Sequence, residues 1–159
     1  MPRLPYVNRE TAPEEVRRIF DGMEKRMGGV SNLALMLGHT PGLLQGFVSL
    51  AGPLLGPGEL PIALREMAYL TVAKLNGCAY CVAHHSHGAS QAGVPDEKIR
   101  AIPSADSPVL AECERAIVRF ATEMTIRVEA SAEALDELRK CLRVPQIVEL
   151  TFAVAAMNL

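Results

Sequence analysis

Signals that begin or end helices recur along the whole chain, and no stretch alternates apolar and polar residues as a half-buried strand does. Hydrophobic residues make up 49% of the 159 residues, yet only 4% are aromatic. The core must therefore consist mainly of Leu, Val, Ile, Ala and Met, which suit packed helices better than aromatic-rich strands. We predict an all-α fold, a multi-helix bundle that forms one domain over residues 1–159.

The boundary signals predict where the helices lie. Thr11 followed by Glu14 resembles a capping box and predicts a helix to about residue 27. Ser31 predicts a cap for a short helix that Gly38 ends, and Pro41 begins another helix before a Gly/Pro loop over 52–61. The remaining helices are expected over 61–76, 78–93, a short stretch to 102, 107–127, 131–142, and from 145 onward.

The stretch from Met27 to Gly58 contains no Lys, Arg, Asp or Glu. It is interrupted by glycines and prolines, whereas a membrane-spanning helix needs about 20 consecutive apolar residues. We therefore predict a buried helical hairpin or a subunit interface, and no membrane partner. The N-terminus lacks the apolar run of a secretory signal, and a net charge of −2 disfavours a nucleic-acid partner. These features predict a cytoplasmic protein.

The four cysteines divide into a pair and two separate residues. Cys78 and Cys81 form a CxxC motif, whereas Cys113 and Cys141 stand apart among apolar residues. Free cysteine behaves as a small buried hydrophobe, so we expect Cys113 and Cys141 to be structural thiols. In a reducing compartment, the CxxC pair is expected to be catalytic or metal-binding.

The spacing around the CxxC motif predicts a reactive thiol. On a helix, Cys78, Cys81 and His85 fall within about 60° of one another, and His84 flanks this stripe. If the preceding helix packs antiparallel, Glu66 lies within about one turn of the level of His85 and is placed to orient it. A helix N-terminus and a histidine both lower a thiol pKa. The helix dipole favours Cys78 as the attacking thiol and proximity to the histidines favours Cys81. We assign attack to Cys81 and resolution to Cys78.

The same residues allow other interpretations. A structural zinc site needs four ligands, and the sequence has no second CxxC or HxxxH, so we predict no metal. Haem attachment needs a histidine directly after the second cysteine, where Val82 stands. A thioredoxin fold needs a βαβ context that the sequence lacks. A purely structural role for the thiols and histidines remains the non-catalytic alternative, together with a zinc-stabilised interaction module.

The spacing from Glu66 through the CxxC motif to His85 resembles the signature of alkylhydroperoxidase D-like proteins in the carboxymuconolactone decarboxylase superfamily. The segments 30–33, 64–66 and 75–78 are similar to stretches common in that group. The resemblance covers the chain from about residue 5 onward. It implies an all-α fold assembled as a trimer or hexamer, and a proton relay of Glu66, Cys78, Cys81 and His85.

The resemblance also implies a function. It predicts a thiol-dependent peroxidase that reduces organic hydroperoxides without a bound cofactor, with an external dithiol or a lipoyl-type group as reductant. Well-studied members carry a histidine between the cysteines, where this chain has Tyr80, and His84 is a candidate to replace it. The alternatives are a disulfide oxidoreductase, a redox sensor, and a carboxymuconolactone-type decarboxylase that needs no cysteine.

Overall fold

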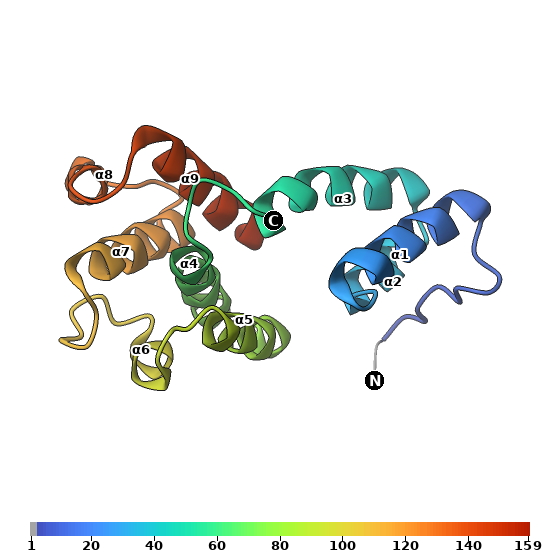
Figure 1. The fold of residues 1–159 in the computed structure, drawn as a ribbon, viewed down its shortest axis with the longest axis horizontal. Coiled ribbons are helices and arrows are strands. Elements are labelled where there is room, and N and C mark those ends of the chain that lie inside the picture. Colours follow the sequence, from blue (N-terminus) through green and yellow to red (C-terminus); the bar gives the residue numbers. More distant parts are fainter. Residues whose placement is uncertain (1–2) are drawn as a thin grey trace. The chain divides into compact units, whose positions relative to one another are not determined.

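The computed structural model describes residues 3–159, so Met1 and Pro2 of the N-terminal segment lie outside the described residues. Over that range the ordered elements are helices, without a β-strand, which confirms the all-α prediction (Figure 1). The chain forms two compact units, the first ending at Leu55 and the second running from Gly56 to Leu159. The single-domain assignment stays a prediction. No helix in the described range is long and apolar enough to cross a membrane.

The first unit contains α1 (Glu14–Met27), α2 (Asn32–Leu37) and α3 (Pro41–Leu55). The hydroxyl of Ser31 accepts a hydrogen bond from the backbone N–H of Ala34, so the predicted cap of α2 is confirmed, and Gly38 ends the helix. The break at Gly38 therefore divides the uncharged stretch into two helices, as predicted. Its role as a subunit interface stays a prediction. The core of this unit consists of Ala12, Val16, Phe20, Met23, Ala34 and Leu44.

Two boundary predictions in the first unit are wrong. The N-cap of α1 is Pro13, with no side-chain cap, because the Thr11 hydroxyl bonds the carbonyl of Asn8 and Glu14 pairs with Arg18. The predicted loop from residue 52 begins later, since α3 continues through Pro53 to Leu55. Pro53 lacks the N–H that would bond the carbonyl four residues earlier, and the helix ends two residues after it.

The second unit is built around α4 (Ile62–Leu75), which packs against α5 (Ala79–Gln91), α7 (Glu112–Ile126) and α9 (Val144–Asn158) (Figure 1). Every residue of α4 from Met67 to Ala73 is buried. A helix that is apolar all round belongs inside a bundle, so α4 serves as the central element. The short helices α6 (Asp96–Ala101) and α8 (Ala132–Arg139) pack on α5 and on α7 with α9, respectively.

A buried ion pair fastens α4 to α9. The Arg65 guanidinium donates to Glu149 at 3.1 Å, and both side chains are largely withdrawn from solvent. The same Glu149 carboxylate accepts the backbone N–H groups of Glu59 and Leu60 at 2.6 and 3.1 Å. A buried charge is stable only with such partners. The Glu149 carboxylate therefore fixes the start of α4, and its partner Arg65 directly precedes Glu66 in the sequence.

Two predictions in the second unit are corrected. Helix α7 begins at Glu112 and not at 107, because Ser107 and Leu110 form a turn and Glu114 accepts the backbone N–H of Ala111 at 2.7 Å. Cys113 and Cys141 are not separate thiols, since they form a disulfide across 28 residues. Packing of α8 on α7 brings them together, and this long-range contact has no local signal in the sequence.

Candidate active site

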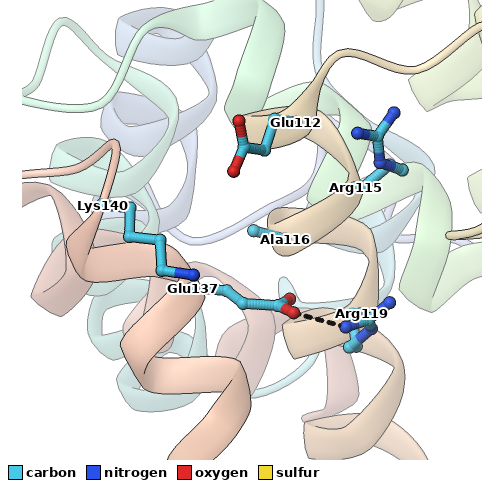
Figure 2. Close-up of a pocket in the computed structure, with 6 residues that line it drawn as sticks. All are labelled: Glu112, Arg115, Ala116, Arg119, Glu137 and Lys140. Carbon is cyan, nitrogen blue, oxygen red and sulfur yellow. Dashed lines mark hydrogen bonds and ion pairs between the residues drawn. The ribbon is translucent and has the colours of Figure 1, made fainter.

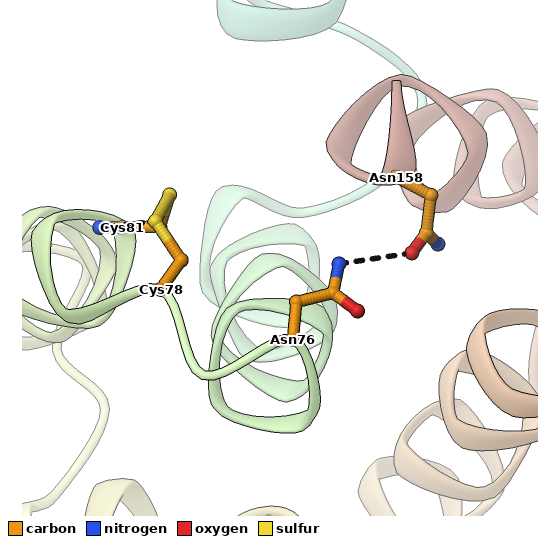
Figure 3. The surroundings of a disulfide bond; sticks show 4 residues. All are labelled: Asn76, Cys78, Cys81 and Asn158. Atoms are coloured by element: carbon orange, nitrogen blue, oxygen red, sulfur yellow. Dashed lines mark hydrogen bonds between the residues drawn. A yellow bond between two sulfur atoms is a disulfide. The ribbon is translucent and has the colours of Figure 1, made fainter.

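The turn between α4 and α5 positions the CxxC motif. Asn76 caps the C-terminus of α4, and Gly77 has a φ of +64°, in the left-handed region that glycine adopts without strain. The Asn76 amide donates to Asn158 at the end of α9 with a distance of 3.1 Å (Figure 3). The Asn158 amide in turn donates to Thr125 of α7. The turn that leads into Cys78 is thereby tied to two other helices.

Cys78 and Cys81 are joined by a disulfide at the start of α5 (Figure 3). Cys78 is the N-cap residue, and its sulfur accepts the backbone N–H of Cys81 at 3.2 Å. Both side chains are partly accessible. Unpaired N–H groups and the positive end of the helix dipole favour a thiolate at such a position when the bond is reduced. The cysteines therefore occupy an accessible place that favours thiolate chemistry.

The structure brings Glu66 and His85 together. Nδ1 of His85 lies 2.9 Å from Oε2 of Glu66, and His85 is only 7% exposed. A carboxylate on one ring nitrogen fixes the orientation of the imidazole and leaves Nε2 to exchange protons. His85 stands one helical turn after Cys81 on α5, on the same side of the helix. The interhelical contact inferred from antiparallel packing is present.

Gly88, which the sequence analysis did not single out, makes room for this pair. A Cβ atom added to Gly88 would lie 2.7 Å from Oε2 of Glu66 and 2.9 Å from its Cδ. Gly88 follows His85 by three residues, so both face the carboxylate from α5. The available signal was an isolated glycine inside a helical pattern, which often marks a close approach.

Tyr69 is a second residue that the sequence analysis missed. It lies three residues after Glu66 on α4, is 2% exposed, and its ring centroid is 4.9 Å from that of His85. Burial raises the pKa of Tyr69 to about 12, so its phenol remains neutral. The ring therefore supports His85 from the side of α4 without adding a charge.

His84 and Tyr80 lie on the exposed part of α5 beside the disulfide. Their rings are nearly parallel, with centroids 6.3 Å apart, and His84 meets His85 edge-on at 5.1 Å. Partial desolvation, with a smaller effect of His85, lowers the pKa of His84. His84 is therefore a neutral donor or acceptor near pH 7, placed between Tyr80 and the Glu66–His85 pair.

No group of three or more His, Cys, Asp and Glu side chains suited to a metal ion occurs among residues 3–159. The chemistry available to this site comes from two sulfurs, an oriented imidazole with its carboxylate, and an adjacent aromatic surface. Such a set can pass electrons through the cysteines and protons through His85.

Comparisons with known proteins identify a family and several structures of similar fold. The family model of the carboxymuconolactone decarboxylase family matches residues 41–123. The AhpD core of a peroxidase-related protein from Ralstonia eutropha JMP134 is 22% identical over 99% of this chain and 86% of its own, with a TM-score of 0.81. ATU0492 from Agrobacterium tumefaciens, an AhpD-type protein of unknown function, is 26% identical over 77% and 85%, with a TM-score of 0.70.

A debrominase is also similar in structure. Bmp8 is 26% identical over 99% of this chain and 86% of its own, with a TM-score of 0.82. A variant of Bmp8 in complex with 2,3,4-tribromopyrrole is 25% identical with the same TM-score. A search of curated proteins gives no significant match.

Proposed function

The chain belongs to the carboxymuconolactone decarboxylase family, in its alkylhydroperoxidase D-like group, and from this premise we propose that it is a thiol-dependent peroxidase. Its substrates are organic hydroperoxides, and Cys78 and Cys81 cycle between dithiol and disulfide. The observation that carries the proposal is the Cys78–Cys81 disulfide at the start of α5, the helix whose His85 is held by Glu66 of α4.

In the first step, the Cys81 thiolate attacks an oxygen of the O–O bond. An S–O bond forms, the O–O bond breaks, and Cys81 becomes a sulfenic acid while the substrate leaves as an alkoxide. His85, held by Glu66, takes the thiol proton and returns it to the alkoxide, which leaves as an alcohol. Imidazole is the side chain suited to this task because it takes up and releases protons readily in the physiological pH range.

In the second step, the Cys78 sulfur attacks the sulfenic acid. The S–S bond forms, and the sulfenic oxygen leaves as water with the Cys78 proton. The helix N-terminus and the N–H of Cys81 stabilise the Cys78 thiolate as nucleophile and later as leaving group. An external dithiol or a lipoyl-type reductant then reopens the disulfide. A cytoplasmic location would keep such a reductant available.

We further propose that the chain acts as a homo-oligomer, a trimer or a hexamer. Val144, Val148 and Phe152 repeat at four-residue intervals on α9 and are exposed, Phe152 by 58% of its surface. An apolar stripe of this kind is typical of a surface that another chain covers.

Reductive dehalogenation is a second candidate function. The observation that favours it is the likeness to the debrominase Bmp8 across nearly the whole chain. The Cys81 thiolate would take bromine from an activated aromatic carbon, which then accepts a proton. Cys78 would displace bromide and form the disulfide. The dithiol is oxidised and the carbon–bromine bond is reduced. The protein therefore ends with the same Cys78–Cys81 disulfide as after peroxide reduction. The exposed Tyr80 and His84 rings offer a surface for an aromatic substrate.

The test counts thiols in a Cys113→Ser/Cys141→Ser background, in which only the CxxC pair reacts. The reduced protein is titrated before and after one equivalent of cumene hydroperoxide. We expect a loss of two thiols with release of one alcohol, and no disulfide when Cys78 or Cys81 is serine. A brominated pyrrole in a parallel sample tests dehalogenation through bromide release.

Each alternative has its own outcome. Oxidation of the pair by a protein or lipoyl disulfide, but not by the peroxide, would replace the peroxidase with a disulfide oxidoreductase or redox sensor. Turnover of a lactone carboxylate that persists after both cysteines are replaced would establish the decarboxylase reaction. Stoichiometric metal together with unreactive thiols would support the zinc module.

A further inference from the structure

The second disulfide, Cys113–Cys141, has no part in the proposed peroxide cycle. Cys113 lies in the first turn of α7, and Cys141 follows the C-terminal end of α8. Cys141 is exposed, whereas Cys113 packs partly against the apolar core of the second unit. One sulfur of this bond is therefore approachable from solvent, and the other is held by packing.

A cavity of about 210 Å³ lies between α7 and α8, the two helices that this bond connects (Figure 2). Of its lining residues, Glu112 immediately precedes Cys113 along the chain, and Lys140 immediately precedes Cys141. The side chains that line it are Glu112, Arg115, Ala116, Arg119, Glu137 and Lys140.

The positive and negative side chains that line the cavity do not balance. Arg119 pairs with Glu137 at 2.6 Å, so these two charges compensate each other. Arg115 uses one nitrogen to bond the carbonyl of Leu110 and remains cationic. Lys140 makes no ion pair with any residue of the described chain, and Figure 2 shows its ammonium group directed toward the space between the helices. With Glu112 as the remaining acid, the lining carries one net positive charge.

We propose that Cys113–Cys141 is a thiol-exchange site for small anionic thiols, whose carboxylate binds beside Lys140 in the α7–α8 cavity. The incoming thiolate attacks the exposed sulfur of Cys141. Cys113 is the leaving group, since it lies at the N-terminus of a 15-residue helix, where the dipole favours a thiolate. Two acids lie in the same turn: Glu114 is compensated by Lys98 at 2.7 Å, and Glu112 lines the cavity together with Arg115 and Lys140.

The exchange balances without a further oxidant. The S–S bond of the protein breaks, a mixed disulfide forms between Cys141 and the small thiol, and Cys113 is released as a thiolate. A second small thiol attacks the mixed disulfide, which releases Cys141 as a thiolate and a small-molecule disulfide. The protein bond is reduced by two electrons, and two thiols are oxidised.

The test uses the full chain with Cys78→Ser and Cys81→Ser, so its result is independent of the peroxidase proposal. The oxidised protein is incubated with mercaptoacetate or with neutral 2-mercaptoethanol, and N-ethylmaleimide traps the released thiol. Peptide mass spectrometry then locates both adducts. We expect mercaptoacetate on Cys141 and the maleimide on Cys113.

Lys140→Gln provides the charge test, and Arg139→Gln is its matched control. Arg139 is adjacent but pairs with Asp136 and does not line the cavity. Lys140→Gln should slow exchange with mercaptoacetate by about two- to fivefold, which is the effect of losing an exposed ion pair. The rate of exchange with 2-mercaptoethanol should change less. Arg139→Gln should change neither rate. The proposal would be overturned if the maleimide were found on Cys141, or if exchange occurred only under unfolding conditions. Equal effects of Lys140→Gln and Arg139→Gln on the exchange rate would also overturn it.

Discussion

Replacing Gly88 with alanine should separate the stability of the protein from the chemistry of the candidate site. The added Cβ would lie 2.7 Å from Oε2 of Glu66, whereas ordinary contact begins at 3.4 Å, so the oxygen must move by about 0.7 Å. That oxygen now lies 2.9 Å from Nδ1 of His85. A shift of this size away from α5 lengthens the hydrogen bond beyond its normal range of about 3.2 Å.

The two energetic effects of Gly88→Ala have opposite signs. Alanine stabilises a helix interior by about 0.5–1 kcal/mol relative to glycine. Loss of a hydrogen bond to a charged group costs about 1.5–3 kcal/mol. The obstructing group is the end of a flexible side chain, so the fold can accommodate it. We therefore expect the free energy of unfolding to fall by about 0.5–2.5 kcal/mol.

The effect on reactivity should be larger. A misplaced general acid–base group loses much of its contribution, and a displacement near 1 Å can cost about 100-fold. Stopped-flow measurement of thiol loss with cumene hydroperoxide should show a fall in rate of about 10- to 100-fold. Gly46→Ala is the matched control, because Gly46 is also helical and a Cβ there would meet nothing within 4 Å.

A double variant adds a stricter condition. Once Glu66→Ala has removed the carboxylate, Gly88→Ala has nothing left to displace, so it should slow the reaction no further. Two results would refute the positioning of His85 through Glu66. One is full reactivity of Gly88→Ala, and the other is an equal loss of rate in the presence and absence of the Glu66 carboxylate.

Three further predictions follow from the structure. Replacing Cys113 and Cys141 with serine removes a cross-link over 28 residues and should lower the free energy of unfolding by about 3–4 kcal/mol in chemical denaturation. The pKa of His84 is lowered in the folded chain, so the unfolded chain binds a proton more readily. The free energy of unfolding should therefore fall as the pH drops below 6.5, and His84→Gln should reduce that loss. Phe152→Glu places a charge on the exposed stripe of α9 and should yield monomers in light scattering, whereas Glu133→Gln on α8 should not. An unchanged oligomer would place the interface elsewhere.

Local contacts explain which features of the fold were predictable from the sequence. The cap at Ser31, the stop at Gly77 and the start of α5 at Cys78 depend on neighbouring residues, and the sequence predicts them correctly. The Glu66–His85 contact also follows from two helices and one tight turn. Thr11 shows the limit of such signals, because its hydroxyl, which was expected to cap α1, donates to the carbonyl of Asn8 instead.

Features that depend on tertiary packing were not predictable. The Cys113–Cys141 bond depends on how α8 packs on α7, and the room beside Gly88 depends on the distance between α4 and α5. Arg65 illustrates the same point, since the sequence gives no indication that its guanidinium is buried against Glu149. A single sequence identifies the residue types at these positions but not the residue that each one contacts.

The position of the site within one helical hairpin also bears on how the protein folds. The Glu66–His85 contact joins residues 19 positions apart, whereas the Asn76–Asn158 contact that braces the turn joins residues 82 positions apart. Closing the shorter loop costs about 1.3 kcal/mol less chain entropy, and contacts of low sequence separation form sooner. We expect the α4–α5 hairpin to belong to the folding nucleus, with α9 docking later. Substitutions in α9 should then accelerate unfolding and leave the folding rate nearly unchanged.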